Sequence, residues 1–105
     1  MDEQISVRLS ICRALLGEIN PKIRAVTPRV SQKRAEIKVF YDGQISEEDL
    51  EDMSDVEASV IADLHEDWSV DLKCVQVDFP ESIPYVDGEW VAHARSESRM
   101  SLPRT

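Results

Sequence analysis

The stretch SEEDLEDMSDVEASVIADLHEDW, residues 46–68, combines two patterns that decide how the chain folds. Hydrophobic residues recur in it every three or four positions, which predicts one apolar stripe along an amphipathic helix. That stripe consists of Leu50, Met53, Val56, Val60, Ile61 and Leu64. The same stretch carries ten acidic residues and neither Lys nor Arg. The sequence therefore predicts a helix with one side in the core and a strongly acidic side facing away from it.

Clear signals mark both ends of this helix. Ser46 is a favoured N-cap residue, and the acidic residues that follow it interact well with the unpaired N–H groups of a first turn. Asp49, three residues after Ser46, approximates a capping box, in which Glu or Gln is the usual partner. The helix is expected to end near Leu64 or His65.

A second helix is expected before this one. The pattern predicts it over residues 3–18, ended by Gly17 and by Pro21, which disfavours a helical conformation in the preceding residue. Its core side is predicted to comprise Ile5, Leu9, Cys12, Leu16 and Ile19, widened on one side by Ile11 and Leu15.

Four strands complete the predicted elements. Residues 23–30 and 34–41 form the first two, and Pro28 indicates an edge strand or a bulge in the first. Residues 69–79 and 89–95 form the last two, separated by a loop rich in Pro and Gly.

The resulting order is αββαββ, which belongs to the α+β class. The simplest packing is a four-stranded, mostly antiparallel sheet with both helices on one face. The 105 residues, of which 42% are hydrophobic, suffice for a single domain with its own core. That domain is predicted over residues 1–95, with a flexible C-terminal tail over residues 96–105.

The net charge of −9 is distributed unevenly. Residues 39–72 hold twelve acidic residues and no Lys or Arg, whereas the remainder carries a net charge of +3. Such a surface repels phosphates, so nucleic acids and anionic membranes are unfavourable partners, and a cationic partner is favoured. The alternative is that the charge serves solubility alone.

Location and cofactors follow from what the sequence lacks. It shows no secretion signal, and it has no apolar run of about 18 residues, so a cytoplasmic protein with two reduced, buried cysteines is expected. It has neither a Gly-rich phosphate loop nor the spacing of a zinc or calcium site, so no cofactor and no metal are predicted. An enzyme with Cys74 and His93 as a nucleophile pair is the least favoured interpretation.

Three segments resemble a known group of proteins. They are ALLGEINPKIRAV (14–26), KVFYDGQISEEDLEDMSDVEASVIADL (38–64) and VDFPESIP (77–84), and the run from Tyr41 to Asp49 is the most specific part. They resemble small bacterial proteins of αββαββ layout that look like immunity proteins of polymorphic toxin systems, including contact-dependent growth inhibition. The resemblance implies a protein without catalytic activity that binds and blocks the toxin made by the same cell.

The resemblance and the charge pattern together lead to one hypothesis. The chain is predicted to be an immunity protein that neutralises a cognate toxin, expected to be a nuclease with a basic active site, through its acidic helix. The predicted partner-binding residues are Glu47, Glu48, Glu51, Asp52, Asp55, Asp63, Glu66, Asp67 and Trp68. Without its partner the protein is expected to be a monomer or a weak dimer. The alternative is a small adaptor or regulatory protein that forms a homodimer through the edge of its first strand.

Overall fold

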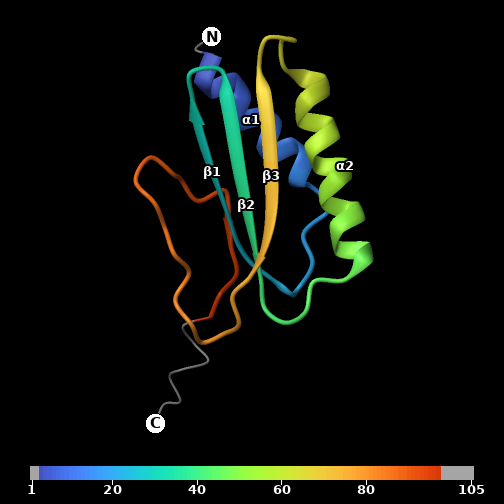
Figure 1. Ribbon diagram of the computed structural model, residues 1–105, viewed down its shortest axis with the longest axis vertical. Helices are drawn as coiled ribbons and strands as arrows, with labels where there is room; N and C mark the ends of the chain where they lie inside the picture. Colours follow the sequence, from blue (N-terminus) through green and yellow to red (C-terminus); the bar gives the residue numbers. More distant parts are fainter. Residues whose placement is uncertain (1–2, 98–105) are drawn as a thin grey trace.

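A computed structural model describes residues 3–97 of the chain. The elements in order are α1 (Glu3–Leu15), β1 (Ile23–Ser31), β2 (Arg34–Tyr41), α2 (Glu47–Asp63), β3 (Ser69–Gln76) and β4 (His93–Ala94). The strands form one sheet in the order β3-β2-β1-β4, and both helices lie on the same side of it (Figure 1). The predicted αββαββ order and the α+β class are therefore confirmed.

Two of the three strand pairings are antiparallel. β1 pairs with β2 through a two-residue turn, Gln32 and Lys33, and β1 also pairs with β4. β2 and β3 are instead parallel over their whole length. Parallel neighbours need a crossover connection, and α2 supplies it by returning the chain to the end of the sheet where β2 began. The sheet is mixed, although most of its pairings are antiparallel as predicted.

The prediction that β1 is an edge strand is wrong, because β1 lies between β2 and β4. Pro28 is tolerated there because its carbonyl accepts a hydrogen bond from the Trp90 N–H (3.0 Å). Since the N–H and C=O positions of a strand residue point to the same neighbour, the missing N–H of Pro28 also faces the segment before β4. Pro28 therefore removes no hydrogen bond to β2. A homodimer through the edge of β1 is excluded, since that edge is already paired.

The last two strands are shorter than predicted. β3 ends at Gln76, and β4 is reduced to His93 and Ala94. The segment before β4 still follows β1 irregularly, since the Ala92 N–H donates to the Val26 carbonyl (2.9 Å).

The core lies between the sheet and the helices, and the buried side of α1 is rotated from the predicted stripe toward its predicted flank, Ile11 and Leu15. Val7, Ile11 and Leu15 are buried. The residues expected there, Ile5, Leu9, Cys12 and Leu16, are exposed, and only Ile19 packs partly against the core. Both stripes have helical spacing, so spacing cannot choose between them. The buried side also contains Ser10, whose hydroxyl donates to Asp63 of α2 (2.7 Å).

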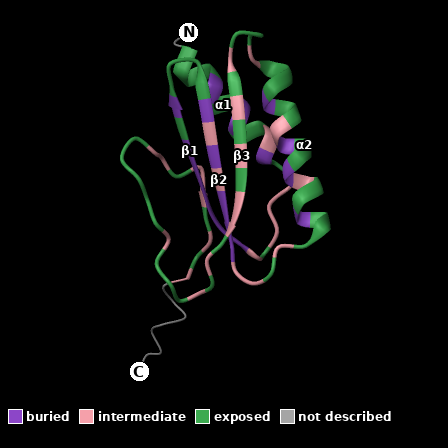
Figure 2. Ribbon diagram, in the orientation of Figure 1, coloured by how far each residue is buried: buried purple, intermediate pink, exposed green. Residues whose placement is uncertain are grey.

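The predicted apolar stripe of α2 is correct only in its centre. Met53, Val56 and Val60 are buried, and Leu64 packs partly against the core. Leu50 and Ile61 are each 53% exposed, because they lie roughly 100° around the helix axis from the buried line. Figure 2 shows that the outer side of α2 is exposed along its length.

Asp49 is the one acidic residue of α2 that is buried, at 4% exposure. The predicted capping box is confirmed: the Asp49 N–H donates to Ser46 Oγ (3.1 Å), and the Ser46 N–H donates to Asp49 Oδ2 (2.9 Å). Asn20 Nδ2 donates to the other carboxylate oxygen, Oδ1 (3.1 Å), and Lys22 forms an ion pair with Oδ2. Burial alone raises the pKa of Asp49, but the bonds from Lys22, Ser46 and Asn20 outweigh it and lower the pKa to about 2.

The structured part of the chain continues past the predicted boundary at residue 95, since Glu97 forms an ion pair with the buried Arg24. Of the predicted flexible tail, residues 98–105 lie outside the described residues. Neither of the two described helices is long and apolar enough to cross a membrane.

The contacts of Asp49 lead to a prediction about stability and pH. Its folded pKa of about 2 lies below the ordinary value of 3.8, so its stabilisation is complete above pH 4 and is lost as the pH falls toward 2. We expect Asp49→Asn to lower the free energy of unfolding at pH 7 by on the order of 1–2 kcal/mol, because solvent around Lys22 screens part of the interaction. Urea unfolding between pH 7 and pH 2 should show this difference shrinking. Asp55→Asn, a neutralisation at an exposed position of the same helix, serves as the control and should cost far less; an equal loss in both variants contradicts the interpretation.

Candidate functional site

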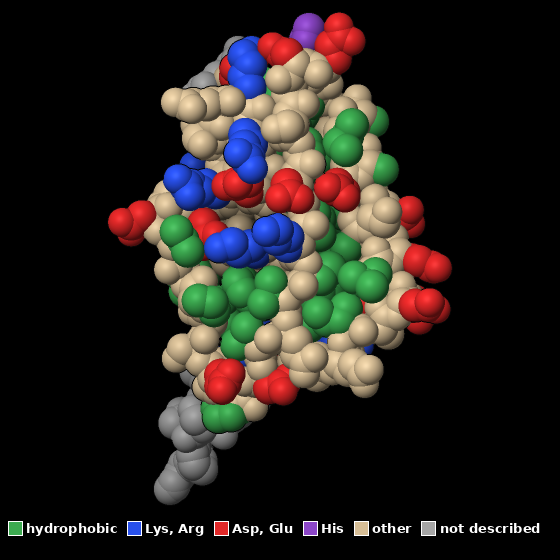
Figure 3. Space-filling model, in the orientation of Figure 1, with side chains coloured by type: hydrophobic (Ala, Val, Ile, Leu, Met, Phe, Trp, Pro, Cys, Tyr) green, Lys and Arg blue, Asp and Glu red, His purple; other side chains and the backbone are tan. Residues whose placement is uncertain are grey.

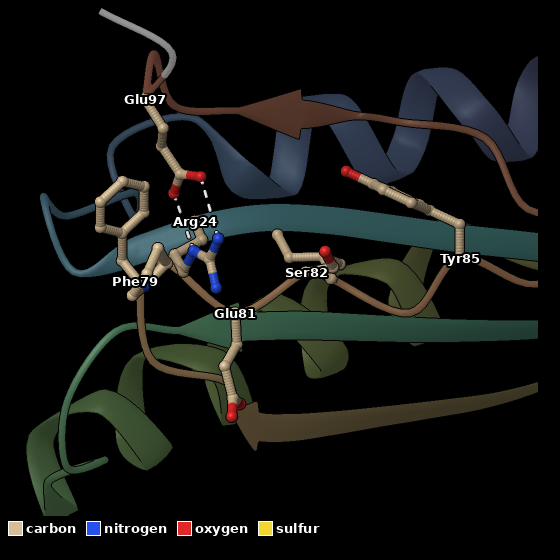
Figure 4. A pocket seen from close by; sticks show the side chains of 8 residues that line it. Arg24, Phe79, Glu81, Ser82, Tyr85 and Glu97 are labelled. Carbon is tan, nitrogen blue, oxygen red and sulfur yellow. Dashed lines mark hydrogen bonds and ion pairs between the residues drawn. The ribbon is translucent and has the colours of Figure 1, made fainter. Parts of the chain in front are cut away.

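A cavity of about 670 Å³ is lined by Arg24, by Glu97 and by the loop that follows β3 (Figure 4). The Arg24 side chain holds both carboxylate oxygens of Glu97, with Nε and Nη2 at 2.8 and 3.0 Å. Nη1 donates to the Val77 carbonyl (2.7 Å), and the guanidinium lies over the Phe79 ring. The guanidinium is thus engaged from both the loop and the end of the described chain.

A second arginine extends this network. Arg95 donates to Glu97 (2.9 Å) and to Asp42 (2.7 Å), and the second Asp42 oxygen accepts the Phe79 N–H (3.1 Å). The hydrogen bond from Arg24 lowers the pKa of Glu97, and the one from Arg95 lowers the pKa of Asp42. Each charge is matched by a fixed partner, so the cluster ties the loop and residue 97 to the sheet and leaves no group poised for chemistry.

The proposed nucleophile pair does not form. Cys74 is on β3 and His93 on β4, which lie at opposite ends of the strand order. Burial raises the pKa of the Cys74 thiol, which disfavours the reactive thiolate, and burial lowers the pKa of His93. Cys12 is exposed, contrary to the expectation of two buried thiols. Within residues 3–97, no three side chains of His, Cys, Asp and Glu gather as metal ligands.

The face of the sheet away from the helices carries charges of both signs. Figure 3 shows basic and acidic side chains alternating across its centre. Lys38 pairs with Glu89 (3.0 Å) and Arg34 with Glu36 (3.3 Å). Because these charges compensate one another locally, this face attracts neither a cationic nor an anionic partner strongly.

The outer side of α2 carries uncompensated charge, and we call this surface the acidic face. It consists of the exposed residues Glu47, Glu48, Glu51 and Asp55 and of Asp52, which is half-buried. In the described chain none of these five carboxylates has an ion pair or a side-chain hydrogen bond. Helical periodicity places Glu47, Glu51 and Asp55 opposite the buried line of α2. Acidic side chains line the right-hand edge of Figure 3, where α2 lies.

The other predicted partner-binding residues have different surroundings. Asp63 accepts from Ser10 and lies 3.5 Å from Arg13, so it joins α2 to α1. Asp67 pairs with Lys33 (3.0 Å). The Trp68 indole N–H donates to Glu3 (3.2 Å), and the side chain packs partly against the core. Glu66 is exposed. The structure thus brings five of the nine residues together on one free surface and uses three others for internal contacts.

Apolar side chains beside the acidic face were missed by sequence reasoning. Leu50 and Ile61 are half exposed on the flank of α2 that faces β3. That flank is identified by Glu57, whose carboxylate accepts the Leu72 N–H of β3 (3.2 Å). The apolar spacing marked both residues as core, so no signal in the sequence separated them from Met53 and Val60.

A second exposed apolar surface lies on α1. Ile5, Leu9 and Leu16 are 49%, 46% and 76% exposed on the side opposite the core. A cavity of about 370 Å³ lies at the end of this helix. It is lined by Cys12, Leu15, Leu16, Gly17, Ile19, Ala92 and His93. Exposed apolar surface of this kind is typical of proteins that bind other proteins.

One family model matches this chain. The model of the MafI2 immunity protein family matches residues 4–97, which include all four strands, α2 and all of α1 except its first residue. No curated protein matches the chain. The family model confirms the resemblance to immunity proteins drawn from the sequence, and its range extends to Glu97, the partner of Arg24.

The Arg24 network leads to a prediction about Glu97. Glu97→Ala leaves the buried guanidinium without its paired carboxylate, so we expect the free energy of unfolding to fall by about 2–3 kcal/mol, less than for a fully buried pair. Ser96→Ala, at the exposed neighbouring position, is the matched control and should stay within about 0.5 kcal/mol of the parent chain. Thermal and urea unfolding measure both, and equal stability of the two variants shows that the pair contributes nothing.

Proposed function

Since the chain belongs to the MafI2 immunity protein family, we propose that it blocks its cognate toxin by placing the acidic face of α2 against a cationic active site. The observation that carries this proposal is the separation of the acidic residues into two groups. Asp49, Asp63 and Asp67 have partners inside the chain, whereas the five residues of the acidic face have none among the described residues. Charge that the fold does not use is available to a partner.

A nuclease is the class of toxin that this surface fits best. The active site of a nuclease must hold phosphates, so it presents Lys and Arg side chains or metal ions. Carboxylates on successive turns of a rigid helix offer negative charges at spacings of about 5–6 Å, comparable to the spacing of phosphates along a strand. The acidic face would then occupy the site in place of the nucleic acid and need no catalytic group of its own.

The arrangement of charge also explains why the helix tolerates its own repulsion. Like charges three or four residues apart destabilise a helix by about 0.2–0.5 kcal/mol per pair. The capping box and the buried Asp49 hold the first turn despite this repulsion. Cationic side chains of a partner would relieve it, so part of the cost in the free protein becomes a gain on binding.

Charge alone supplies speed and orientation more than affinity. Complementary charge raises association from about 10⁵–10⁶ to as much as 10⁸–10⁹ M⁻¹s⁻¹ at low salt, which suits a protein that must intercept a toxin before it acts. Affinity requires apolar contacts that exclude water. Leu50 and Ile61 flank the acidic face and are exposed in the free protein, so they are the anchors that we assign to the interface.

Two further properties follow from the proposal. Blocking by occupation is stoichiometric, so one immunity protein inactivates one toxin without turnover. A toxin that degrades cellular nucleic acid acts in the cytoplasm, and the immunity protein must be present there to meet it.

Charge reversal tests the acidic face. We expect the triple variant Glu51→Lys, Asp52→Lys, Asp55→Lys to weaken binding of the cognate toxin by at least about 100-fold and to abolish protection of the cell. These positions follow the first turn, so the capping box stays intact. The control variant Glu18→Lys, Glu81→Lys, Asp87→Lys makes the same change in net charge away from α2. Circular dichroism checks folding, and full protection by the first variant disproves the role of the acidic face.

Salt dependence provides an independent prediction. Between about 50 and 500 mM salt, the association rate of the parent protein should fall by at least about tenfold, because screening shortens the range of the charges. The dissociation rate, governed by the apolar anchors, should change much less. Stopped-flow mixing measures both rates. An association rate that does not depend on salt would indicate that the interface lies away from α2, and it would leave the immunity function itself uncontradicted.

A further inference from the structure

β3 is an edge strand whose outer side is unpaired in the described chain. It pairs with β2 over all eight of its residues. The Ser69 N–H donates to Lys33 and the Val77 N–H to Tyr41, so odd-numbered residues bond inward to β2. Even-numbered residues, Val70, Leu72, Cys74 and Gln76, therefore direct their N–H and C=O groups outward. A row of outward groups of this kind is a template for another strand, and proteins usually shield it.

The shield on this edge is a single side chain. Glu57 of α2 accepts the outward N–H of Leu72 (3.2 Å). A carboxylate in this position takes the place that the carbonyl of an added strand would occupy. Unlike a backbone carbonyl of a neighbouring strand, it is carried on a flexible side chain that can turn to solvent or to a cationic partner.

Apolar side chains extend along the same seam. Positions 50, 54, 57 and 61 share the flank of α2 that faces β3, and Leu50 and Ile61 are half exposed there. Figure 3 shows hydrophobic side chains gathered between the sheet and the acidic edge of α2. Leu50 and Ile61 are about 16 Å apart along the helix, a length that five residues of an extended strand span. Alternate side chains of an added strand would cover both.

We propose that the outer edge of β3, together with Leu50, Glu57 and Ile61 of α2, accepts an extended segment of the toxin as a fifth strand of the sheet. This inference rests on the proposed function, because it assumes that the toxin is the partner. The segment carries apolar residues on the side that faces α2 and Lys or Arg where it approaches the acidic face. Its main chain bonds to the outward groups of β3, and its side chains provide the selectivity.

A second copy of the chain does not fit this edge. α2 lies beyond β3, on the outer side of that strand (Figure 1). A twofold axis beside β3 would bring the α2 helices of two copies into the same space. A single strand meets no such obstacle, since it occupies only the layer of the sheet and lies against the flank of α2.

Hydrogen exchange tests the inference on the intact complex with the cognate toxin. In the free protein the outward amides of Val70, Cys74 and Gln76 should exchange quickly, whereas the inward amides of Asp71, Lys73 and Val75 are already protected. Strand addition should slow the outward amides by at least about 100-fold in the complex and leave the inward amides almost unchanged. Outward amides that exchange as quickly in the complex as in the free protein overturn the proposal.

A pair of variants at one position gives a second test. Cys74→Pro removes an outward donor without touching a bond to β2, whereas Cys74→Ala keeps the donor and removes only the thiol. Relative to the alanine variant, we expect the proline variant to bind the toxin at least about tenfold more weakly. Equal affinity of the two folded variants refutes strand addition. If the parent protein forms no complex with the toxin, the proposed function is wrong. If a complex forms but the outward amides exchange as in the free protein, only strand addition is wrong.

Discussion

The position of α2 depends on one buried carboxylate. Asp49 is bonded to the cap residue Ser46, to Asn20 and to Lys22, so it joins the first turn of α2 to the chain between α1 and β1. A buried charge persists only where it is paired and hydrogen-bonded, and rotating α2 would break several of these contacts together. Because the rotation of the helix is held in this way, the structure determines which carboxylates face outward and which flank lies along β3.

The order of the elements was predictable because it depends on local signals. The capping box at Ser46 is read over a few residues, and it agrees with the structure. The rotation of α1 was not predictable, since Val7, Ile11 and Leu15 and the exposed Ile5, Leu9 and Leu16 satisfy the same spacing. Likewise, the interior position of β1 depends on the distant segment before β4, and Pro28 alone suggested an edge.

The acidic surface is a second case in which long-range contacts could not be predicted from local sequence patterns. The sequence shows that acidic residues are concentrated in residues 39–72, but it does not show which of them have partners within the chain. In the structure, Asp63 and Asp67 each meet a basic residue from another part of the chain, Arg13 and Lys33, and only long-range packing decides this. The free charge among the described residues is therefore smaller than the total, and five of its carboxylates lie in the first three turns of α2, where Leu50 is also exposed.

α2 separates two apolar surfaces, and they differ in what they can offer a partner. On one side α1 and the turn after it present Ile5, Leu9 and Leu16, and this surface offers side chains but no strand edge. On the other side β3 adds outward main-chain groups to Leu50 and Ile61. Main-chain bonds fix the direction and register of a bound segment, whereas apolar contact alone does not. If the toxin binds the acidic face as proposed, an interface of about 800 Å² centred there would reach β3, and it would gain there both the geometric constraint and the apolar burial that charge cannot supply.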